Sequence, residues 1–579
     1  MGKEGKRIIL AAALSFLVLI IFQFVMTKSQ KPAVKSAQKS AVTEEITAAA
    51  EIKATETVAA AKPAEAVTVK PKAVLKSEEL VITTPSAVIT FNTAGGVIKH
   101  WVLQKYKENG QPVDMVWQSS ENILPGTLVI PSLKFDDNVL YKGTQTKTGV
   151  EFTAVVKGVA EITKTYSFRE QEFTCDITLN IKSLNKEVKE IKDVKLYLGA
   201  GVNNHFIYDE KGVILQKDMK KIVENMAVYS NIHYLDKKLV KNVFTMKQTV
   251  NEKKEPDLII KEAALQTGVG ELSWLGIKDK YYISVFIPKE NSGARGEEHA
   301  MMFSPKLEQK KDNVTIEVDS HFAMPVGSLL LPVLDGEKGG SFTTAYYSGP
   351  IVYENLKAFK VGLDRGMELG WSWFNIFGIG MLIILKWCYL YLFSNWGVAI
   401  IIVTVLLKVI TWWPTQKSYE AMKKMTDIQP EINALKEKYK DNAQKMTEET
   451  MRIYKEKKVN PLGGCLPMLI QIPIFVAFYA VLANAIELKG AAFLIWTDLS
   501  VRDPYFILLI LMLGTMILQQ KMTPVTDPQQ AKMMMWLMPG IFAFIFWSLP
   551  AGLLLYFTVQ NILSIAQQWM VNRKPKTTA

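Results

Sequence analysis

Hydrophobic residues gather at two places in this chain, the N-terminus and the region after residue 370, and between them polar and apolar positions alternate in short runs. Residues 8–26 form an apolar run of 19 residues behind the basic residues Lys3, Lys6 and Arg7. A cleavable signal has a shorter core and a small-residue cleavage site. Residues 1–27 therefore predict an uncleaved anchor helix with a cytoplasmic N-terminus, followed by an exported segment.

The exported segment divides into a linker and a β domain. Residues 28–77 are rich in Ala, Lys, Thr, Glu and Pro and contain no aromatic residue, which predicts a disordered tether. Residues 78–350 contain short alternating runs, at 80–83, 87–91, 161–168 and 173–181, separated by Gly and Asn/Asp turns. Many short strands with turn signals predict an all-β sandwich.

The apolar region 371–413 is long enough for one span or two, and charge distinguishes these alternatives. Residues 415–460 carry eleven Lys and Arg residues, which would lie outside the cell if the region held two spans. The positive-inside rule favours one span, at 395–414. Residues 371–392, with their aromatic side chains and Lys386, are then expected to lie as an amphipathic helix along the outer interface.

The charged segment 415–460 predicts a cytoplasmic helical hairpin. Its first helix contains a kink at Pro430, a turn follows at Asp441-Asn442, and Thr447 is the expected N-cap of the second helix. A hairpin that is polar on nearly all sides has little apolar surface to bury. Two interpretations stay open: a solvated connection between spans, or a mobile arm that meets cytoplasmic partners or emerging chains.

Residues 461–568 predict four more transmembrane helices, at 462–482, 504–520, 533–547 and 552–566, and 569–579 form a basic tail. Basic flanks at Lys521, Lys532 and the tail place both chain ends inside. The fold class expected is thus a polytopic α-helical membrane protein with six spans and a large exported β domain. The last two spans are short, which implies a thinned bilayer or a packed setting.

Composition narrows the function classes. The net charge of +12 fits basic cytoplasmic faces better than nucleic-acid binding, because no basic helix with interleaved aromatic residues stands on a soluble domain. The three cysteines form no CxxC pair, which argues against a zinc site or a disulfide scaffold. All five histidines lie within 78–350 without HExxH spacing, and no GxSxG motif occurs, so we expect no enzyme and no cofactor.

Lys408 is the strongest candidate for a functional residue. It lies about 20 Å below the outer end of its span, at a rise of about 1.5 Å per residue, and charge at membrane depth marks a functional site by default. Thr404 shares its helix face, and Gln471 on the next span offers a second polar wall. The alternatives are a lysine that snorkels to the inner interface and a glutamine in an ordinary interhelical hydrogen bond. Together the three residues predict a wet groove that attracts polar or acidic peptide segments.

Several ordered motifs carry a family resemblance. NPLGGC stands at 460–465, Pro467 and QIPIF at 471–475 follow it, and NWG at 395–397, DPY at 503–505, QKM at 520–522, TDP at 526–528 and LPAGL at 549–553 keep the same order. Over about 371–570 the chain resembles the YidC/Oxa/Alb membrane insertases. Its anchor and exported β domain resemble the Gram-negative YidC type.

The resemblance implies a five-helix core around a hydrophilic groove that is open to cytoplasm and lipid, a β-supersandwich, and a chaperone and insertase of the cell inner membrane that consumes no nucleotide or metal. The groove charge of that family is usually arginine, and Lys408 occupies the position here, with Thr404 and Gln471. Pro473, Phe475, Tyr556 and Phe557 would form the wall along which a substrate slides.

The implied partners are nascent membrane proteins, the lipid bilayer and the Sec translocon, with the ribosome and the signal recognition particle receptor as further candidates. Two rival functions stay open. A transporter or channel would need a path through both leaflets, although the predicted spans after 462 contain no Asp, Glu or His that could couple ions. An anchored β-domain enzyme would keep its activity without residues 360–579.

Overall fold

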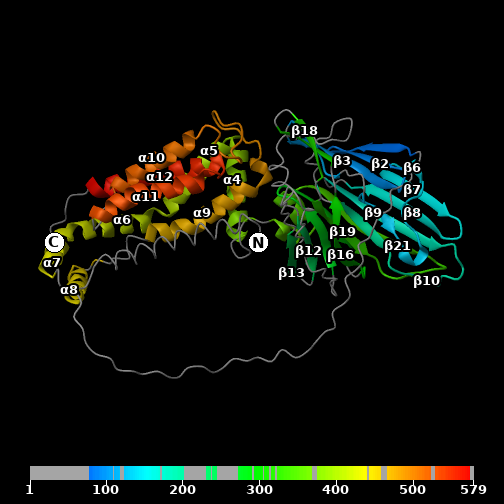
Figure 1. The fold of residues 1–579 in the computed structure, drawn as a ribbon, viewed down its shortest axis with the longest axis horizontal. Helices are drawn as coiled ribbons and strands as arrows, with labels where there is room; N and C mark the ends of the chain where they lie inside the picture. The colour runs from blue at the N-terminus through cyan, green and yellow to red at the C-terminus, as the bar shows by residue number, and fades with distance from the viewer. Residues whose placement is uncertain are drawn as a thin grey trace, which may run out of the picture.

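A computed structural model gives the fold of part of the chain. The structure describes residues 77–108, 110–117, 123–169, 173–200, 202, 230–235, 238–243, 272–289, 292–303, 306–311, 314–319, 322–367, 369, 375–439, 442–457, 459, 466–522 and 528–573. The predicted anchor, the predicted linker up to residue 76 and the NPLGGC motif lie outside the described residues. Sheets form one part of the molecule and helices the other (Figure 1).

The largest sheet has nine strands. In spatial order they are β13 (Lys238–Val243), β12 (Ser230–Leu235), β14 (Leu272–Lys278), β15 (Tyr282–Pro288), β21 (Gly340–Pro350), β9 (Thr174–Ser183), β8 (Ala160–Phe168), β7 (Gly149–Val156) and β6 (Lys142–Gln145). All of its printed pairings are antiparallel, as expected for strands joined by short turns.

Two smaller sheets have four strands each. One has the order β16 (Arg295–Phe303), β19 (Phe322–Leu330), β11 (Lys195–Ala200) and β5 (Leu128–Val129); the other has the order β1 (Glu79–Thr83), β2 (Ala87–Asn92), β3 (Val97–Glu108) and β4 (Gln111–Asp114). The remaining elements are the pairs β10 (Glu190–Ile191) with β20 (Leu334–Asp335) and β17 (Lys306–Lys311) with β18 (Val314–Asp319), and the short helices η1 (Pro131–Leu133), α3 (Tyr353–Ala358) and η2 (Leu363–Gly366). The strands predicted at 80–83, 87–91, 161–168 and 173–181 are confirmed as β1, β2, β8 and β9.

Both four-stranded sheets cover the same face of the nine-stranded sheet. The strand registers place Tyr166, Tyr346 and Phe286 on one face, because residues directly opposite each other point the same way. Phe91 of β2 lies 4.9 Å from the Tyr166 ring, and Trp101 of β3 lies 5.5 Å from the Tyr346 ring. The β1–β4 sheet therefore packs on that face.

The second cover is the sheet that contains β19. Leu275 of β14 is opposite Phe286 and so shares its face. A Cβ added at Gly327 of β19 would stand 3.4 Å from the Leu275 side chain, which places the two strands in contact. The described part of the β domain is thus layered around one apolar face, as the alternating runs predict.

A lysine lies at the centre of this apolar layer. Lys164 of β8 is fully buried and donates to two backbone carbonyls, 2.7 and 2.8 Å away, and to the carboxylate of Asp137. Asp137 also accepts from the Leu128 N–H at 2.7 Å and the Tyr141 hydroxyl at 2.8 Å. Burial and the nearby carboxylate raise the pKa of Tyr141, so its hydroxyl stays protonated and donates.

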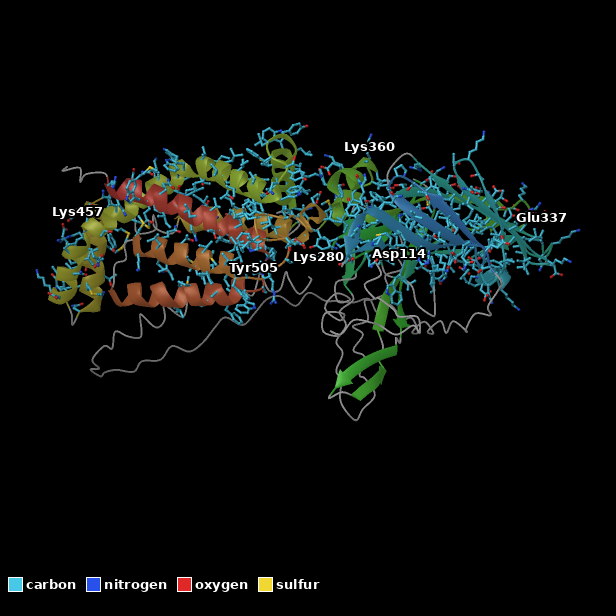
Figure 2. The ribbon with its side chains drawn as sticks, turned by 90° about the horizontal axis from the view of Figure 1, so that it is seen from above. Asp114, Lys280, Glu337, Lys360, Lys457 and Tyr505 are labelled. Carbon is cyan, nitrogen blue, oxygen red and sulfur yellow. The ribbon has the colours of Figure 1, made fainter. Side chains whose placement is uncertain are left out.

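The helical part follows the sheets in the chain. Its elements are α4 (Asn375–Tyr391), α5 (Trp396–Ile410), α6 (Trp412–Asp427), α7 (Gln429–Lys438), α8 (Ala443–Glu456), α9 (Leu466–Asn484), η4 (Ile486–Leu488), α10 (Ile507–Met522), α11 (Pro528–Phe546) and α12 (Ala551–Arg573). α12 packs against α5, α6, α9 and α10, and α4 packs against α5 and α9. Figure 2 shows Lys457 at the end of the helices far from the sheets and Tyr505 at the end near them.

Helix bounds correct several expectations. The stretch 395–414 is not one straight helix: α5 ends at Ile410, and α6 continues after a break of one residue at an angle of 63°. α11, of 19 residues, begins before the apolar stretch at 533–547 and ends at Phe546, and α12, of 23 residues, extends beyond the stretch at 552–566 on both sides. The apolar part described within α11 is only Leu537–Phe546, so the short last spans stay a prediction although the helices that contain them are longer.

The six-span count stays a prediction. Of the helices in the described ranges, none alone combines the length and apolar character that crossing a bilayer requires. α5 and α6 meet those criteria of length and composition as a bent pair.

The predicted hairpin at 415–460 differs from expectation in its caps. Pro430 does not kink a helix but stands in the first turn of α7, after α6 has ended at Asp427. Thr447 lies inside α8, and the N-cap is Asn442, whose side chain accepts from the Lys445 N–H at 3.0 Å. The segment also buries a small apolar cluster, formed by Ile428, Ile432 and Val459 with Met425, Ile453 and Tyr454 around it. The segment 415–460 therefore buries more apolar surface than its polar sequence predicts.

The cap assignment leads to a prediction. Asn442→Ala should destabilise α8 by about 1 kcal/mol, because the first-turn N–H of Lys445 loses its acceptor. Thr447→Ala, inside the helix, is the matched variant and should cost less. Amide hydrogen exchange of the first turn of α8 measures the difference. Faster exchange in Thr447→Ala than in Asn442→Ala would show that Thr447, and not Asn442, is the N-cap of α8.

Ion pairs join the sheets to the helices. Lys386 Nζ of α4 lies 2.6 Å from Glu354 of α3 and 3.3 Å from Glu487 of η4. Lys489, directly after η4, lies 3.3 Å from Glu108 of β3. Burial raises the pKa of Glu487, and the positive charge of Lys386 opposes that rise. The segment around η4 is thus connected to both parts of the molecule.

Candidate functional site

The helix α5 carries two of the predicted site residues on one buried face. Its apolar run starts behind Asn395, whose side chain caps it by accepting from the Val398 N–H at 3.1 Å. Thr404 and Lys408, four residues apart, are 0% and 3% exposed. The Thr404 hydroxyl donates to the Ile400 carbonyl at 2.6 Å within its own helix.

The Lys408 ammonium group bonds to a neighbouring helix. Its Nζ lies 2.8 Å from Ser564 Oγ of α12. In the part of the chain that the structure describes, no carboxylate pairs with it. The side chain points at α12 and is almost fully covered, which favours a buried cation over a lysine that snorkels to the interface. The helices hold a cation that lacks a counter-charge among the described residues.

α12 presents a row of polar side chains at helical spacing. Tyr556, Gln560, Ser564 and Gln568 follow one another at intervals of four residues, so they lie on one face of the helix. Gln560 Nε2 donates to Gln471 Oε1 of α9 at 3.2 Å, and Gln471 donates to the Tyr556 hydroxyl. The row therefore binds Gln471 one turn before it reaches Lys408.

Gln471 and Lys408 meet through α12. Gln471 was predicted to offer a second polar wall beside Lys408, and the structure bonds each of the two residues to α12. Gln471 is in an interhelical hydrogen bond, as the alternative interpretation held. Lys408 and Gln471, together with the row on α12, form what we call the polar layer, and α12 lies between the two residues.

The polar layer continues toward α6. Gln567 of α12 is fully buried and donates to the Trp412 carbonyl at 3.0 Å, and Thr415 donates to Gln567 Oε1 at 3.2 Å. Lys423 donates to the Val571 carbonyl at 3.3 Å. These bonds hold α6 along the last turns of α12, beyond the bend at Thr411.

The predicted aromatic wall stands on the other side of Gln471. Phe475 of α9 lies 5.4 Å from Phe557, and Phe478 stacks on Tyr556 at 4.2 Å. Tyr556 is buried, whereas Gln471, Phe475 and Phe557 are half-buried. Pro473 is half-buried in α9 between Gln471 and Phe475 and has no N–H to donate. The structure thus brings Gln471, Phe475, Tyr556 and Phe557 together.

Four further polar residues of α12 and α6 belong to this site, although the sequence pattern did not single them out. They are Gln560, Ser564, Gln567 and Thr415. A signal for two of them was present, since a polar residue recurs every fourth position from Tyr556 to Gln568 in a helix whose intervening positions are mostly apolar. Only Lys408 stood out, because a charge is the costliest residue at membrane depth.

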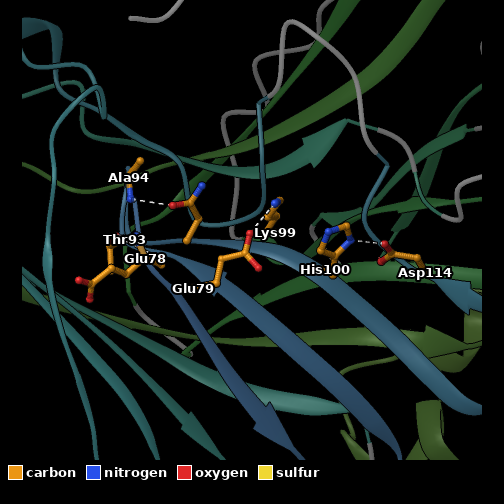
Figure 3. Close-up of polar contacts among 8 residues, drawn as sticks. Glu78, Glu79, Thr93, Ala94, Lys99, His100 and Asp114 are labelled. Carbon is orange, nitrogen blue, oxygen red and sulfur yellow. Dashed lines mark hydrogen bonds and ion pairs between the residues drawn. The ribbon is translucent and has the colours of Figure 1, made fainter. Parts of the chain in front are cut away.

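One histidine of the β domain can be placed among the described residues. His100 is the histidine whose side chain the structure describes, and its Nδ1 lies 2.7 Å from Asp114 Oδ2 (Figure 3). The other Asp114 oxygen accepts from the Trp101 and Val116 N–H groups at 3.0 and 3.1 Å, so the carboxylate fastens β3 to β4. No group of His, Cys, Asp and Glu that could hold a metal occurs in the described ranges.

Comparison with known proteins decides the family. A model described as "60Kd inner membrane protein" matches residues 387–578, and one described as "YidC periplasmic domain" matches residues 79–376. The chain belongs to the YidC membrane protein insertase family. The β-rich part is therefore the periplasmic domain of an inner-membrane protein of this family, and one end of the helices lies near it.

Relatives and a solved structure give the extent of the likeness. A protein of Syntrophus aciditrophicus named membrane protein insertase YidC is 32% identical over 98% of this chain and 99% of its own length. A namesake from Nitratidesulfovibrio vulgaris (strain Miyazaki F) is 34% identical over 99% of this chain and 100% of its own length. An active YidC insertase crystal structure with its first transmembrane domain resolved covers 86% of this chain at 18% identity, with a TM-score of 0.34. The family assignment rests on the sequence matches.

Proposed function

We propose that this chain inserts nascent proteins into the bacterial inner membrane and assists their folding there. One observation carries the proposal beyond family membership: a lysine that is 3% exposed among apolar helices, with Ser564 as its partner and no carboxylate paired with it in the described residues. An isolated buried cation is costly. A negatively charged or polar segment of a substrate would lower that cost.

The polar layer and the aromatic wall bind different parts of a substrate. The polar flank of a substrate binds near Lys408, with Thr404, Ser564 and Gln471 as neighbouring polar groups. Its hydrophobic segment moves along Pro473, Phe475, Tyr556 and Phe557 into lipid. The chemistry is binding and release, and no covalent bond changes.

Access to Lys408 requires movement between α5 and α12. The two helices are in contact, and the Lys408–Ser564 bond crosses that contact. The break at Thr411 separates α5 from α6, so α5 is able to shift while α6 stays bonded to Gln567. The groove that the family resemblance implies is then a conformation that a substrate opens.

The finer topology completes the proposal. Six spans place both termini in the cytoplasm, α4 lies along the outer interface, and the periplasmic domain is a β-supersandwich. α7 and α8 lie at the end of the bundle opposite the sheets (Figure 1), which supports a cytoplasmic arm. That arm and the basic tail would meet the ribosome or the signal recognition particle receptor, while the helices work alone or beside the Sec translocon.

Reconstitution tests the proposal directly. A small membrane protein with a short acidic translocated tail is synthesised in the presence of proteoliposomes that contain only this chain, and protease protection of the tail reports insertion. Protection above that in empty liposomes is expected. Absence of protection, together with solute flux through the same proteoliposomes, would favour a transporter or channel instead.

A further inference from the structure

A tight hairpin with an apolar tip follows η4, at the end of the helices near the periplasmic domain. The backbones of Phe493 and Trp496 exchange two hydrogen bonds, of 2.8 and 2.9 Å, around a turn of two residues. Those two residues, Leu494 and Ile495, are 82% and 53% exposed. Polar residues, Gly and Pro usually occupy such turns, so two exposed aliphatic side chains need a reason.

The base of this hairpin is rigid. The Phe493 ring packs against Gly397 in the first turn of α5, where any Cβ would overlap the ring. Asn395, the N-cap of α5, donates to the Ala492 carbonyl at 3.3 Å. Trp496 is buried and donates through Nε1 to Asp503 at 2.8 Å. The tip is therefore held out from a fixed base that is joined to α5.

The turn backbone adds a second observation. Leu494 has a φ of +50°, in the left-handed region that glycine adopts far more readily than leucine. The fold thus holds a large apolar side chain at the outermost position of the turn, in a conformation that would favour glycine. Both side chains of the tip thus stay exposed among the described residues, Leu494 the more so.

The surroundings of the tip match a membrane–water boundary. Tyr505 and Trp547 belong to the same end of the bundle and are 57% and 54% exposed. Trp547 packs on Phe506 with ring centroids 4.5 Å apart, and the exposed Arg502 stands shortly before Phe506 in the sequence. Exposed Trp and Tyr side chains are typical of the interface, where arginine also meets lipid phosphates.

From these observations we propose that Leu494 and Ile495 insert into the outer leaflet of the inner membrane, with phospholipid acyl chains as their binding partner. Because Phe493 and Asn395 join the hairpin to the start of α5, the inserted tip fixes the outer end of the helix that carries Lys408. The hairpin thereby sets the depth of the polar layer in the bilayer. This inference concerns lipid contact and stands whether or not the chain inserts substrates.

Photocrosslinking in a bilayer tests the contact. The full chain, with p-benzoylphenylalanine at position 494, is placed in phosphatidylethanolamine–phosphatidylglycerol nanodiscs and irradiated. Denaturing mass spectrometry then measures the fraction of chains that carry one added lipid. Position 155 serves as the matched control, because Val155 is an exposed apolar residue, 65% exposed, on β7 of the periplasmic domain.

We expect lipid adducts at 494 to exceed those at 155 severalfold. A second variant, with the same amino acid at position 495, should behave like the first and guards against local distortion at the strained position 494. Equal lipid yields at 494, 495 and 155 would overturn the proposal. So would crosslinks to a second copy of the chain in place of lipid, which would assign the tip to a protein interface.

Discussion

Lys408→Glu should reduce insertion of an acidic-tailed substrate by about tenfold or more, whereas Lys408→Arg should retain most of it. The reversed charge repels the tail in a setting that water screens weakly, and a loss of about 1.4 kcal/mol already corresponds to tenfold. Arginine keeps the charge, and the family resemblance implies arginine at this position. Lys408→Ala should lie between the two. The initial rate of protease-protected product in proteoliposomes measures the effect.

Two controls separate a local charge from the net charge of the protein. Lys521→Glu makes the same charge change at an exposed lysine in the last turn of α10 and should leave the rate nearly unchanged. A substrate with a basic tail should lose less from Lys408→Glu than one with an acidic tail. Equal effects of Lys408→Glu and Lys408→Arg would remove the electrostatic role.

Asp137→Ala should destabilise the periplasmic domain by about 3–5 kcal/mol, the cost of breaking a buried ion pair from one side. Lys164 would keep its two carbonyl acceptors but lose the carboxylate, and it has no path to solvent because it is 0% exposed. The Leu128 N–H and the Tyr141 hydroxyl would lose their acceptor as well. Denaturant unfolding of the full chain in nanodiscs, followed by the circular dichroism of the sheets, measures the change.

A surface pair on the same sheet provides the matched substitution. Asp176→Ala removes the partner of Arg169, but these two side chains are 25% and 44% exposed. Its cost should therefore stay below about 1 kcal/mol. The double variant Asp137→Leu with Lys164→Met should recover most of the loss, since apolar residues of similar size can replace a buried pair. An equal cost for Asp137→Ala and Asp176→Ala would show that the pair does not hold the layer together.

The periodic elements were predictable because their signals are local. A half-buried strand alternates every second residue, and the runs at 80–83, 87–91, 161–168 and 173–181 all became strands. The same local signal did not reveal the role of Lys164, which reads in EITKTYSF as one more polar position. Its partner Asp137 lies 27 residues away, and only the packing of the sheets closed both of them off from water.

Helix ends were less predictable than helix existence. Thr447 and Asn442 are both good N-cap residues, and the choice between them depended on where the helix began after α7. The bend at Thr411, by contrast, has a local signal in Pro414, which has no N–H to bond to the Ile410 carbonyl and whose ring crowds that carbonyl. The bend lies where α6 follows α12 and bonds to Gln567.

By itself the sequence determined the family, the division into an exported β domain and apolar helices, and the choice of Lys408 as a candidate. The signals for them are ordered motifs, alternation and a charge in an apolar run, and each of these is local in the sequence. The tertiary structure decided which residues meet Lys408. Ser564 lies 156 residues away from it and is an ordinary serine until α12 packs against α5. The same holds for Leu494 and Ile495, whose exposure follows from the docking of Phe493 on Gly397. Side-chain partners and exposure depend on how distant segments pack, and no local pattern specifies that packing.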